Sequence, residues 1–538
     1  MAVTYRKQFG IAFILIPIIM VVLMSGCSFG KKSDSDVVTG MWIVTELTTS
    51  DSFNYQIEQA VATFEAEHEG ITVRVDILPT DEAEREVYQQ QIRTQIMAGN
   101  GPDVYILPTD NVLTVDSKTK FSQKVLTSQI EIDPLFQDVM QAMHSGVFAD
   151  ISSFYDSDTD LDTEALQQDV MDAGVIDGRR YVLPLRYTMP ILLTEPSNYD
   201  DTGITQECID SGIDALAAYA VETDDAMMAV GLQMPDDTTL LSQLFDYEKG
   251  EMVITQQEIA DYMRLYQQVH ALAQPTAEQY IAGLLEELRV VLDELYNHYF
   301  EDPLAAAMVE ITLDSFNSVD DYGEYGYHWS QEGFPLYSDS LTGALDQTAI
   351  AKVLNKELQA EPMRCTDGSV SAEVTYYGAV GSSCSNPELA YSFLRTFLTE
   401  DYQWDLVRPR AKRENIDFFN LPQEKQVDGL IENSWPVRTG ASAYLWDSLQ
   451  YQNFYEGYVY EDYNKALKSN DLNITDADMP VLNVSIDEVR FPLYQPYEES
   501  LSCALALLNN EDGTPTDVDV DELAGEVYQY LWWHLAEG

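Results

Sequence analysis

Basic side chains are scarce in this sequence. It holds 29 lysines and arginines against 91 aspartates and glutamates, which gives a formal net charge of -62. Proteins that bind nucleic acid need a basic surface to meet the phosphates, so we exclude a nucleic-acid partner. The acidic residues are spread along the chain, and we interpret them as a solvated surface that favours solubility.

The motifs of common metal and catalytic sites are also lacking. The chain has six histidines, no HExxH or GxSxG sequence and no phosphate-binding glycine loop. The acidic run Asp156–Asp162 is similar to a calcium loop, but the sixth and twelfth positions hold Leu161 and Gln167 instead of Gly and Glu. We therefore expect no metal, no cofactor and no catalytic group. A pair of glycosidase carboxylates drawn from distant parts of the chain is not excluded by spacing.

Cysteine is rare, and its spacing forms no motif. Of five cysteines, Cys208, Cys365, Cys384 and Cys503 are scattered without a CxxC pair. An extracytoplasmic location would permit disulfides. The spacing does not decide whether any form, and buried free thiols fit it equally well.

Long apolar runs are lacking except near the N-terminus. Two basic residues precede the apolar run 11–24, and Cys27 follows a Ser-Gly pair. Pro17 interrupts this run of about 14 residues, which is shorter than the roughly 20 of a membrane-spanning helix, so a membrane helix is the less favoured interpretation. The segment resembles a bacterial lipoprotein signal. This resemblance implies that residues 1–26 are removed, that Cys27 carries the acyl chains, palmitate among them, and that residues 27–37 form a tether.

The chain beyond the tether shows alternating strand and helix patterns. It is long enough for two or three domains. An apolar run over 41–44 predicts a strand, helical spacing over 57–64 predicts a helix, and alternation over 71–77 predicts a second strand. A further helix over 82–97 leads through a Gly/Pro turn into a buried strand over 104–107. This order is typical of a parallel sheet.

Polar residues come directly after the ends of these strands. Ligands of open α/β sheets lie beyond the carboxyl ends of the strands. Residues 108–111, at the end of the third strand, are therefore predicted at the lip of a cleft.

The order of these pieces resembles a known family, the extracellular solute-binding proteins of ABC importers, in particular the carbohydrate-binding group that includes maltose-binding protein. The residues that carry the resemblance are Trp42, the stretch Phe64–Val73 (FEAEHEGITV), Ala98–Val104 (AGNGPDV), Gly146–Ile151 (GVFADI) and Asp177–Pro184 (DGRRYVLP). In the C-terminal half they are Tyr376–Val380 (YYGAV), Ser385–Leu398 (SNPELAYSFLRTFL) and Trp435–Arg438 (WPVR). Within the second set, Asn386 can cap a helix that has Pro387 at its first position.

The resemblance implies an α/β, two-lobed periplasmic-binding-protein-like (type II) fold with an interlobe cleft and an enlarged helical second lobe. It places residues 38–187 and 376–436 in the N-terminal lobe, and residues 188–375 and 437–538 in the C-terminal lobe. Crossing segments are expected near 184–190, 375–380 and 436–440. Helical apolar faces recur between about 197 and 325, where the resemblance fades. We interpret this block as an elaborated lobe surface, with a separate partner-binding module as the alternative.

The same resemblance implies a monomeric, extracellular, lipid-anchored receptor that closes on a small solute, expected to be a carbohydrate, and docks on the permease of an ABC transporter. A sugar receptor needs aromatic rings and directional hydrogen-bonding groups. By position in the family pattern, the ligand-binding candidates are Glu46, Asp110, Tyr187 and Thr188, and candidate stacking residues are Trp329, Tyr377, Trp435 and Tyr497. For each aromatic, ordinary packing in the core or between lobes is the alternative.

Two other functions stay open at this point. One is a surface enzyme that acts on glycans, with the block 197–325 as an added module. The other is a receptor for a non-sugar solute such as a polyamine or a peptide. The ordered family motifs and the lack of a recognisable catalytic motif favour a receptor over an enzyme. The acidic residues are spread over the whole chain, so they do not indicate a cation in the cleft.

Overall fold

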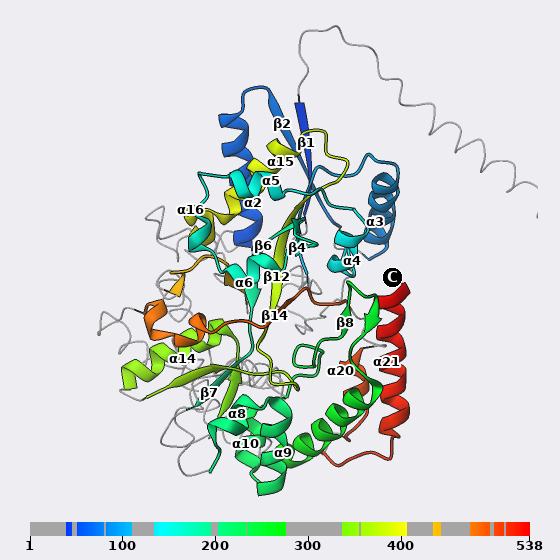
Figure 1. Ribbon diagram of the computed structural model, residues 1–538, viewed down its shortest axis with the longest axis vertical. Helices are drawn as coiled ribbons and strands as arrows, with labels where there is room; N and C mark the ends of the chain where they lie inside the picture. Colours follow the sequence, from blue (N-terminus) through cyan, green and yellow to red (C-terminus); the bar gives the residue numbers. More distant parts are fainter. Residues whose placement is uncertain are drawn as a thin grey trace, which may run out of the picture.

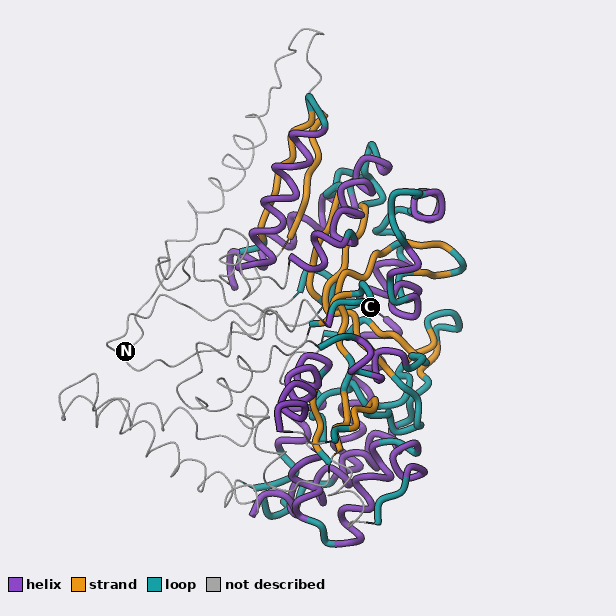
Figure 2. Tube along the Cα trace, turned by 90° about the vertical axis from the view of Figure 1, so that its left-hand side faces the viewer, coloured by secondary structure: helices purple, strands orange, loops and turns teal. Residues whose placement is uncertain are grey.

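The computed structural model describes most of the chain after the tether. The described residues are 39–45, 51–79, 82–109, 134–194, 203–232, 234–275, 336–354, 357–405, 434–442, 474–494, 500–510 and 513–537. They form a mixed α/β protein with a large sheet in its upper part and helices gathered at its lower end (Figures 1 and 2). The C-terminus lies near the level where these two parts meet.

The main sheet has seven strands within the described residues. Its order is β13-β6-β12-β3-β1-β2, and β14 pairs with the start of β12. The strands are β1 (Thr39–Thr45), β2 (Ile71–Ile77), β3 (Val104–Pro108), β6 (Val182–Thr188), β12 (Ser371–Val380), β13 (Trp435–Pro436) and β14 (Glu488–Arg490). β1 pairs in parallel with β2 and β3, whereas β12 is antiparallel to β3 and β6. The parallel half confirms the sheet that the sequence predicts.

Helices cover both faces of this sheet (Figure 1). On one side lie α2 (Asp51–Glu67) and α15 (Pro387–Leu394), and on the other α3 (Glu82–Met97) and α4 (Val139–His144). Phe64 of α2 meets Phe393 of α15 edge to face, with 5.3 Å between ring centroids. Asn386 caps α15 by accepting a hydrogen bond from the Leu389 amide at 3.2 Å, which confirms the predicted cap.

Shorter elements complete this upper part. They are α5 (Ser152–Ser157), η1 (Thr163–Ala165), α6 (Gln168–Asp172), β4 (Val175–Ile176), β5 (Arg179–Arg180), η3 (Arg395–Leu398) and α16 (Glu400–Asp405). We call the main sheet with α2–α6, α15, η3 and α16 the sheet part.

A small sheet joins the sheet part to the rest of the molecule. It consists of β10 (Tyr337–Asp339), β7 (Ile191–Thr194) and β11 (Gln359–Pro362), and α14 (Leu341–Leu354) lies between β10 and β11 in the chain. The short helices η6 (Asp476–Asp478) and η7 (Pro480–Asn483) lie beside α14 (Figure 1). Alternation along β7 serves two cores: Ile191 and Leu193 belong to the first apolar cluster, which contains the main sheet, and Leu192 belongs to the second. The chain re-enters the main sheet at Ser371, and the expected crossing segment near 375–380 lies within β12, whose residues 376–379 pair with both β3 and β6.

The second apolar cluster holds together what we call the helical part. Its elements are α8 (Gln206–Asp210), α9 (Ile213–Thr223), α10 (Ala226–Leu232), the hairpin β8 (Phe245–Asp246) and β9 (Glu251–Met252), the helical residues 256–275, α20 (Leu501–Ala506) and α21 (Val520–Glu537). Ile259 and Met263 face this cluster at the spacing that predicts a helix. Residues 276–335, most of the rest of the predicted helical block, lie outside the described residues.

Candidate functional site

Two threonines mark the carboxyl ends of adjacent strands in the main sheet. Thr45 ends β1 and is paired with Ile106 of β3, and Thr109 comes directly after the end of β3. Both side chains are buried. Glu46 and Asp110, the two predicted ligand acids, are next to these threonines in the sequence and lie outside the described residues.

Several other predicted residues also fall outside the described ranges, namely Trp329, Tyr497 and the predicted lipidation residue Cys27. The remaining four, Tyr187, Thr188, Tyr377 and Trp435, lie on the three adjacent strands β13, β6 and β12. The structure therefore brings together the predicted residues that it describes, although they are far apart in the sequence.

Tyr187 and Trp435 form a cross-strand pair. Trp435 of β13 stands opposite Tyr187 of β6, and Val374 of β12 flanks Tyr187 on its other side. Each aromatic side chain is 3% exposed. Burial, with a smaller contribution from the Asp476 carboxylate, raises the pKa of Tyr187. In this arrangement the two rings pack between strands, and Thr188, opposite Glu373, is the half-buried member of the set.

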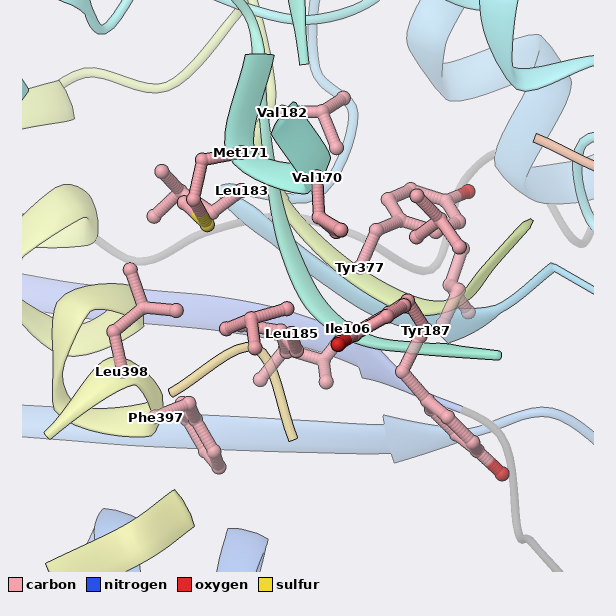
Figure 3. Packing of buried hydrophobic residues seen from close by; sticks show 14 of the residues in the cluster. Ile106, Val170, Met171, Val182, Leu183, Leu185, Tyr187, Tyr377, Phe397 and Leu398 are labelled. Atoms are coloured by element: carbon pink, nitrogen blue, oxygen red, sulfur yellow. The ribbon is translucent and has the colours of Figure 1, made fainter. Parts of the chain in front are cut away.

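Tyr377 is a core residue in this structure. It is 1% exposed, and its ring meets Phe148 and Phe491 edge to face, with centroid distances of 6.3 and 6.0 Å. Figure 3 shows it among the packed side chains around β6 and β3. This placement is the ordinary core packing that the sequence left as the alternative to ligand stacking.

The edge of the sheet beside these aromatics is irregular. The register between β12 and β6 shifts between Val374 and Tyr376 and again between Tyr376 and Tyr377. These shifts leave Thr375 of β12 and Leu185 of β6 without a partner in the ladder. β-Bulges of this kind are common next to functional sites, because they re-aim side chains and end regular pairing.

A polar network forms hydrogen bonds with the backbone groups that are left unpaired at the bulges. We call it the strand-end network and define it as Thr109, Arg186, Thr375, Gln403 and Ser434. The Thr109 amide donates to the Thr375 carbonyl at 3.1 Å, and the Thr109 hydroxyl donates to the carbonyl of Val374. The hydroxyls of Thr375 and Ser434 lie 2.8 Å apart. The network thus connects the end of β3 with β12 and β13.

Arg186 is the charged member of the strand-end network. Its side chain is 1% exposed, and it donates to the carbonyl of Ser434 at 3.3 Å and to that of Gln403 at 3.5 Å. Its Nε has no hydrogen-bond partner among the described residues. Within the described residues no carboxylate pairs with it, and burial lowers its pKa accordingly.

Gln403 of α16 is the neutral centre of the same network. Its amide nitrogen donates to the carbonyls of Leu185 at 3.1 Å and Phe397 at 2.7 Å, and its amide oxygen accepts from the Arg438 backbone at 3.3 Å. The bulged Leu185 therefore regains a partner. These contacts fix the mutual placement of β6, β13 and α16, and with it the Tyr187–Trp435 pair.

Sequence reasoning missed Arg186 and Gln403. Arg186 left one signal, a lone charge within the apolar strand run VLPLRYT. Gln403 left none, because its partners lie at sequence separations of up to 218 residues.

The acidic run Asp156–Asp162 serves a structural role. Asp158 accepts hydrogen bonds from the Tyr391 hydroxyl at 3.0 Å and from Arg395 at 2.7 Å, and Arg395 also meets Asp160 at 3.3 Å. Asp162 lies 3.7 Å from Arg438. Three carboxylates of this run thus pair with arginines.

The remaining observations concern metal ligands, thiols and helix length in the part of the chain that the structure describes. No group of three or more His, Cys, Asp or Glu side chains there is placed to hold a metal ion. Within the described residues, the cysteines Cys208, Cys365, Cys384 and Cys503 are free thiols. Burial raises the pKa of Cys384 to about 12, which keeps this thiol protonated. None of the helices in these ranges is both long enough and apolar enough to cross a bilayer.

No protein-family model and no curated protein matches the chain. Solved structures do match. One is an extracellular solute-binding protein family 1 member from Alicyclobacillus acidocaldarius, with 12% identity, 94% of this chain and 100% of that chain covered and a TM-score of 0.43. Another is the GacH receptor of Streptomyces glaucescens, solved unliganded and with acarbose, with 11% identity, 93% and 99% coverage and a TM-score of 0.41.

A de novo designed cysteine esterase also matches, with 13% identity, 94% and 99% coverage and a TM-score of 0.45. Several of the similar structures are solute- or sugar-binding proteins, the kind of protein that the sequence motifs resemble. At these identities and TM-scores, the likenesses decide neither the ligand nor the activity of this chain.

Proposed function

We propose that this chain is an extracytoplasmic solute receptor of an ABC importer, which binds a carbohydrate between two lobes and presents it to the membrane permease. The lobes would correspond to the predicted divisions, residues 38–187 with 376–436 and residues 188–375 with 437–538. Binding would shift the population of the molecule towards a closed form that docks on the permease.

The observation that carries this proposal is the way in which the chain passes between its parts. β6 runs from the main sheet directly into β7 of the small sheet, and β11 leads back into β12, the antiparallel neighbour of β6. The aromatic pair Tyr187–Trp435 lies beside this passage, and so does the strand-end network, which includes Thr109 after the end of β3. A ligand held there would contact both parts, which is what a receptor that closes on its solute requires.

A carbohydrate is the proposed solute because of the residues on offer. Pyranose rings present apolar faces that stack on aromatic side chains, and hydroxyls that bond to carboxylates and amides. Glu46, Asp110, Thr188, Trp329 and Tyr497 remain the proposed ligand contacts. Tyr187 and Trp435 would take part where closure exposes their edges, and Tyr377 would support them from the core.

A thermal-shift screen of the mature chain tests the binding function. Mono- and oligosaccharides, polyamines and short peptides are added in turn, and a ligand of the native state at a hundredfold excess over Kd adds about 2.7 kcal/mol of stability. We expect a shift with a glycan that is recovered intact. Release of hydrolysis products would favour the surface enzyme, and a response to polyamines or peptides alone would remove carbohydrate from the proposal.

The anchor is tested separately. We propose that acyl chains on Cys27 hold the receptor at the outer face of the membrane, where two or more chains anchor stably and one does so only marginally. The Cys27→Ser variant should appear in the medium instead of the membrane fraction, measured by immunoblotting. Cys208→Ser, which leaves the N-terminal segment intact, is the matched control. A Cys27→Ser protein that stays with the membrane would exclude lipid anchoring.

A further inference from the structure

One side chain of a hairpin in the helical part touches the sheet part. The strands β8 and β9 pair Phe245 with Met252 and Asp246 with Glu251. The turn between them is closed by the Gly250 amide, which donates to the Asp246 carbonyl at 2.7 Å. Phe245 is buried in the second apolar cluster, and Met252 packs against it, so the base of the hairpin belongs to the helical part.

Tyr247 of this hairpin extends to the sheet part. Its hydroxyl donates to Oδ2 of Asp138 at 2.9 Å, and its ring lies nearly parallel to that of His144, with 5.8 Å between centroids. Phe245 supports the ring edge to face at 5.0 Å. Figure 1 shows the hairpin beside α4 at the meeting of the two parts.

Asp138 is firmly held on its own side. It caps α4, since its Oδ1 accepts from the Gln141 amide at 2.9 Å. Val139 and Met143 of α4 are buried in the first apolar cluster. Burial raises the pKa of the Asp138 carboxyl, and the bonds from Gln141 and Tyr247 act against that rise.

We propose that Tyr247 is a positioning residue, which clasps the helical part to the sheet part through Asp138 and holds the two in the arrangement seen here. Each end of the clasp is anchored in a different apolar cluster, whereas the link consists of one hydrogen bond and the stacked rings of Tyr247 and His144. Such a contact can separate and re-form without exposing either core. An effect of the clasp on solute binding would rest on the proposed receptor function. The existence of the clasp does not depend on that function.

Hydrogen–deuterium exchange of the solute-free protein tests the clasp. Tyr247→Phe keeps the ring but removes the hydroxyl. We expect exchange about tenfold faster, the scale of one lost charge-assisted hydrogen bond, in two peptides that belong to different parts, 137–144 and 245–252. A rise confined to 245–252 would overturn the proposal, because the hairpin would then move without affecting α4.

Tyr262→Phe is the matched control. Its hydroxyl donates to the Pro235 carbonyl at 2.5 Å within the helical part, so its loss should leave peptide 137–144 unchanged. Asp138→Asn retains a good helix cap and weakens only the clasp. Combined with Tyr247→Phe it should add little beyond either single change, whereas additive effects would show that the two residues act independently. No solute is present in these measurements, so failure of the clasp and failure of the receptor function are distinguishable.

Discussion

Arg186 and Gln403 lie in the same buried network but differ in charge, and the difference determines what each contributes to stability. Arg186 carries a charge out of water and meets only neutral carbonyls among the described residues. Gln403 is neutral and satisfies the bulged strand with three hydrogen bonds. Burying a charge without an ionic partner is expensive, whereas a neutral amide with all its partners is not.

We therefore expect Arg186→Met to change the free energy of unfolding by less than about 1 kcal/mol, because relief of the buried charge offsets the lost hydrogen bonds. Gln403→Leu should cost about 3 kcal/mol, since it leaves several buried backbone groups unpaired. Urea unfolding measures both. A larger loss for Arg186→Met than for Gln403→Leu would contradict this assignment.

Asp214 gives the stability of the protein a pH dependence. Burial, followed by repulsion from Asp261, raises the pKa of Asp214 to about 6, and its Oδ1 is buried without a partner in the described chain. The native state then binds a proton more tightly than the unfolded state, so the wild type loses stability as the pH rises from about 4 to about 6.

Asp214→Asn removes this loss. After allowance for the exposed part of the side chain, we expect the variant to be more stable than the wild type by about 1 kcal/mol at pH 7 and equal to it near pH 4. Thermal unfolding across this pH range provides the comparison. Asp261→Asn, which removes only the lesser cause, should show a smaller effect, and a difference for Asp214→Asn that does not vary with pH would refute the explanation.

At the scale of elements, α9 depends on the residue before it. Gly212 precedes the helix with φ +105°, and a Cβ there would overlap the carbonyl oxygen of Cys365. The backbone conformation and the close approach both require glycine. Gly70 comes after α2 with φ +89°, and a Cβ there would meet no atom of the described chain within 4 Å.

Gly212→Ala should therefore lower the free energy of unfolding by about 3 kcal/mol or more, because strain and overlap act together. Gly70→Ala should cost only about 1–2 kcal/mol, the penalty of the conformation alone. Chemical denaturation of the two variants side by side measures this difference. Equal decreases in the free energy of unfolding would mean that the backbone near Cys365 can shift at little energetic cost.

Elements with a regular period were predictable from the sequence. The expected strand 71–77 and helix 82–97 match β2 and α3 residue for residue, since alternation, helical spacing and the Gly/Pro turn all agree there. The two-residue strand β13 and the bulges opposite β6 were not predictable. They form where segments that are distant in the sequence pair with each other, and the local sequence pattern does not predict such pairing.

The whole molecule is subject to strong self-repulsion. A net charge of -62 favours expanded states, and most of its described ion pairs have at least one exposed partner that water screens. Raising the salt concentration from about 10 mM to about 150 mM shortens the screening length from about 30 Å to about 8 Å.

We expect this change to raise the Tm by about 5 °C, because the repulsion between carboxylates falls more than the attraction of exposed pairs. Calorimetry in sodium chloride tests it, with sucrose of equal osmolality as the uncharged control. A Tm that falls on addition of salt would show that attraction between charges outweighs repulsion.

The candidate site was only partly predictable at this scale. The sequence predicts Tyr187, Tyr377 and Trp435 as ligand contacts, and this stays a prediction. The structure places them on neighbouring strands, but the sequence does not separate a ring that faces a ligand from one that fills a core. Thr109 of the strand-end network bonds to the carbonyl of Val374, which is 265 positions away in the sequence. The members of this network are ordinary polar residues, and only the folded chain distinguishes them.

The place of β12 in the main sheet has a consequence for how the protein is made. This strand fills the gap between β3 and β6, yet it begins only at Ser371. Until β12 has been synthesised, the neighbouring edges of β3 and β6 have unpaired backbone groups. Such exposed edges promote association with other nascent chains. The growing polypeptide should therefore need a chaperone until its central strand has been translated.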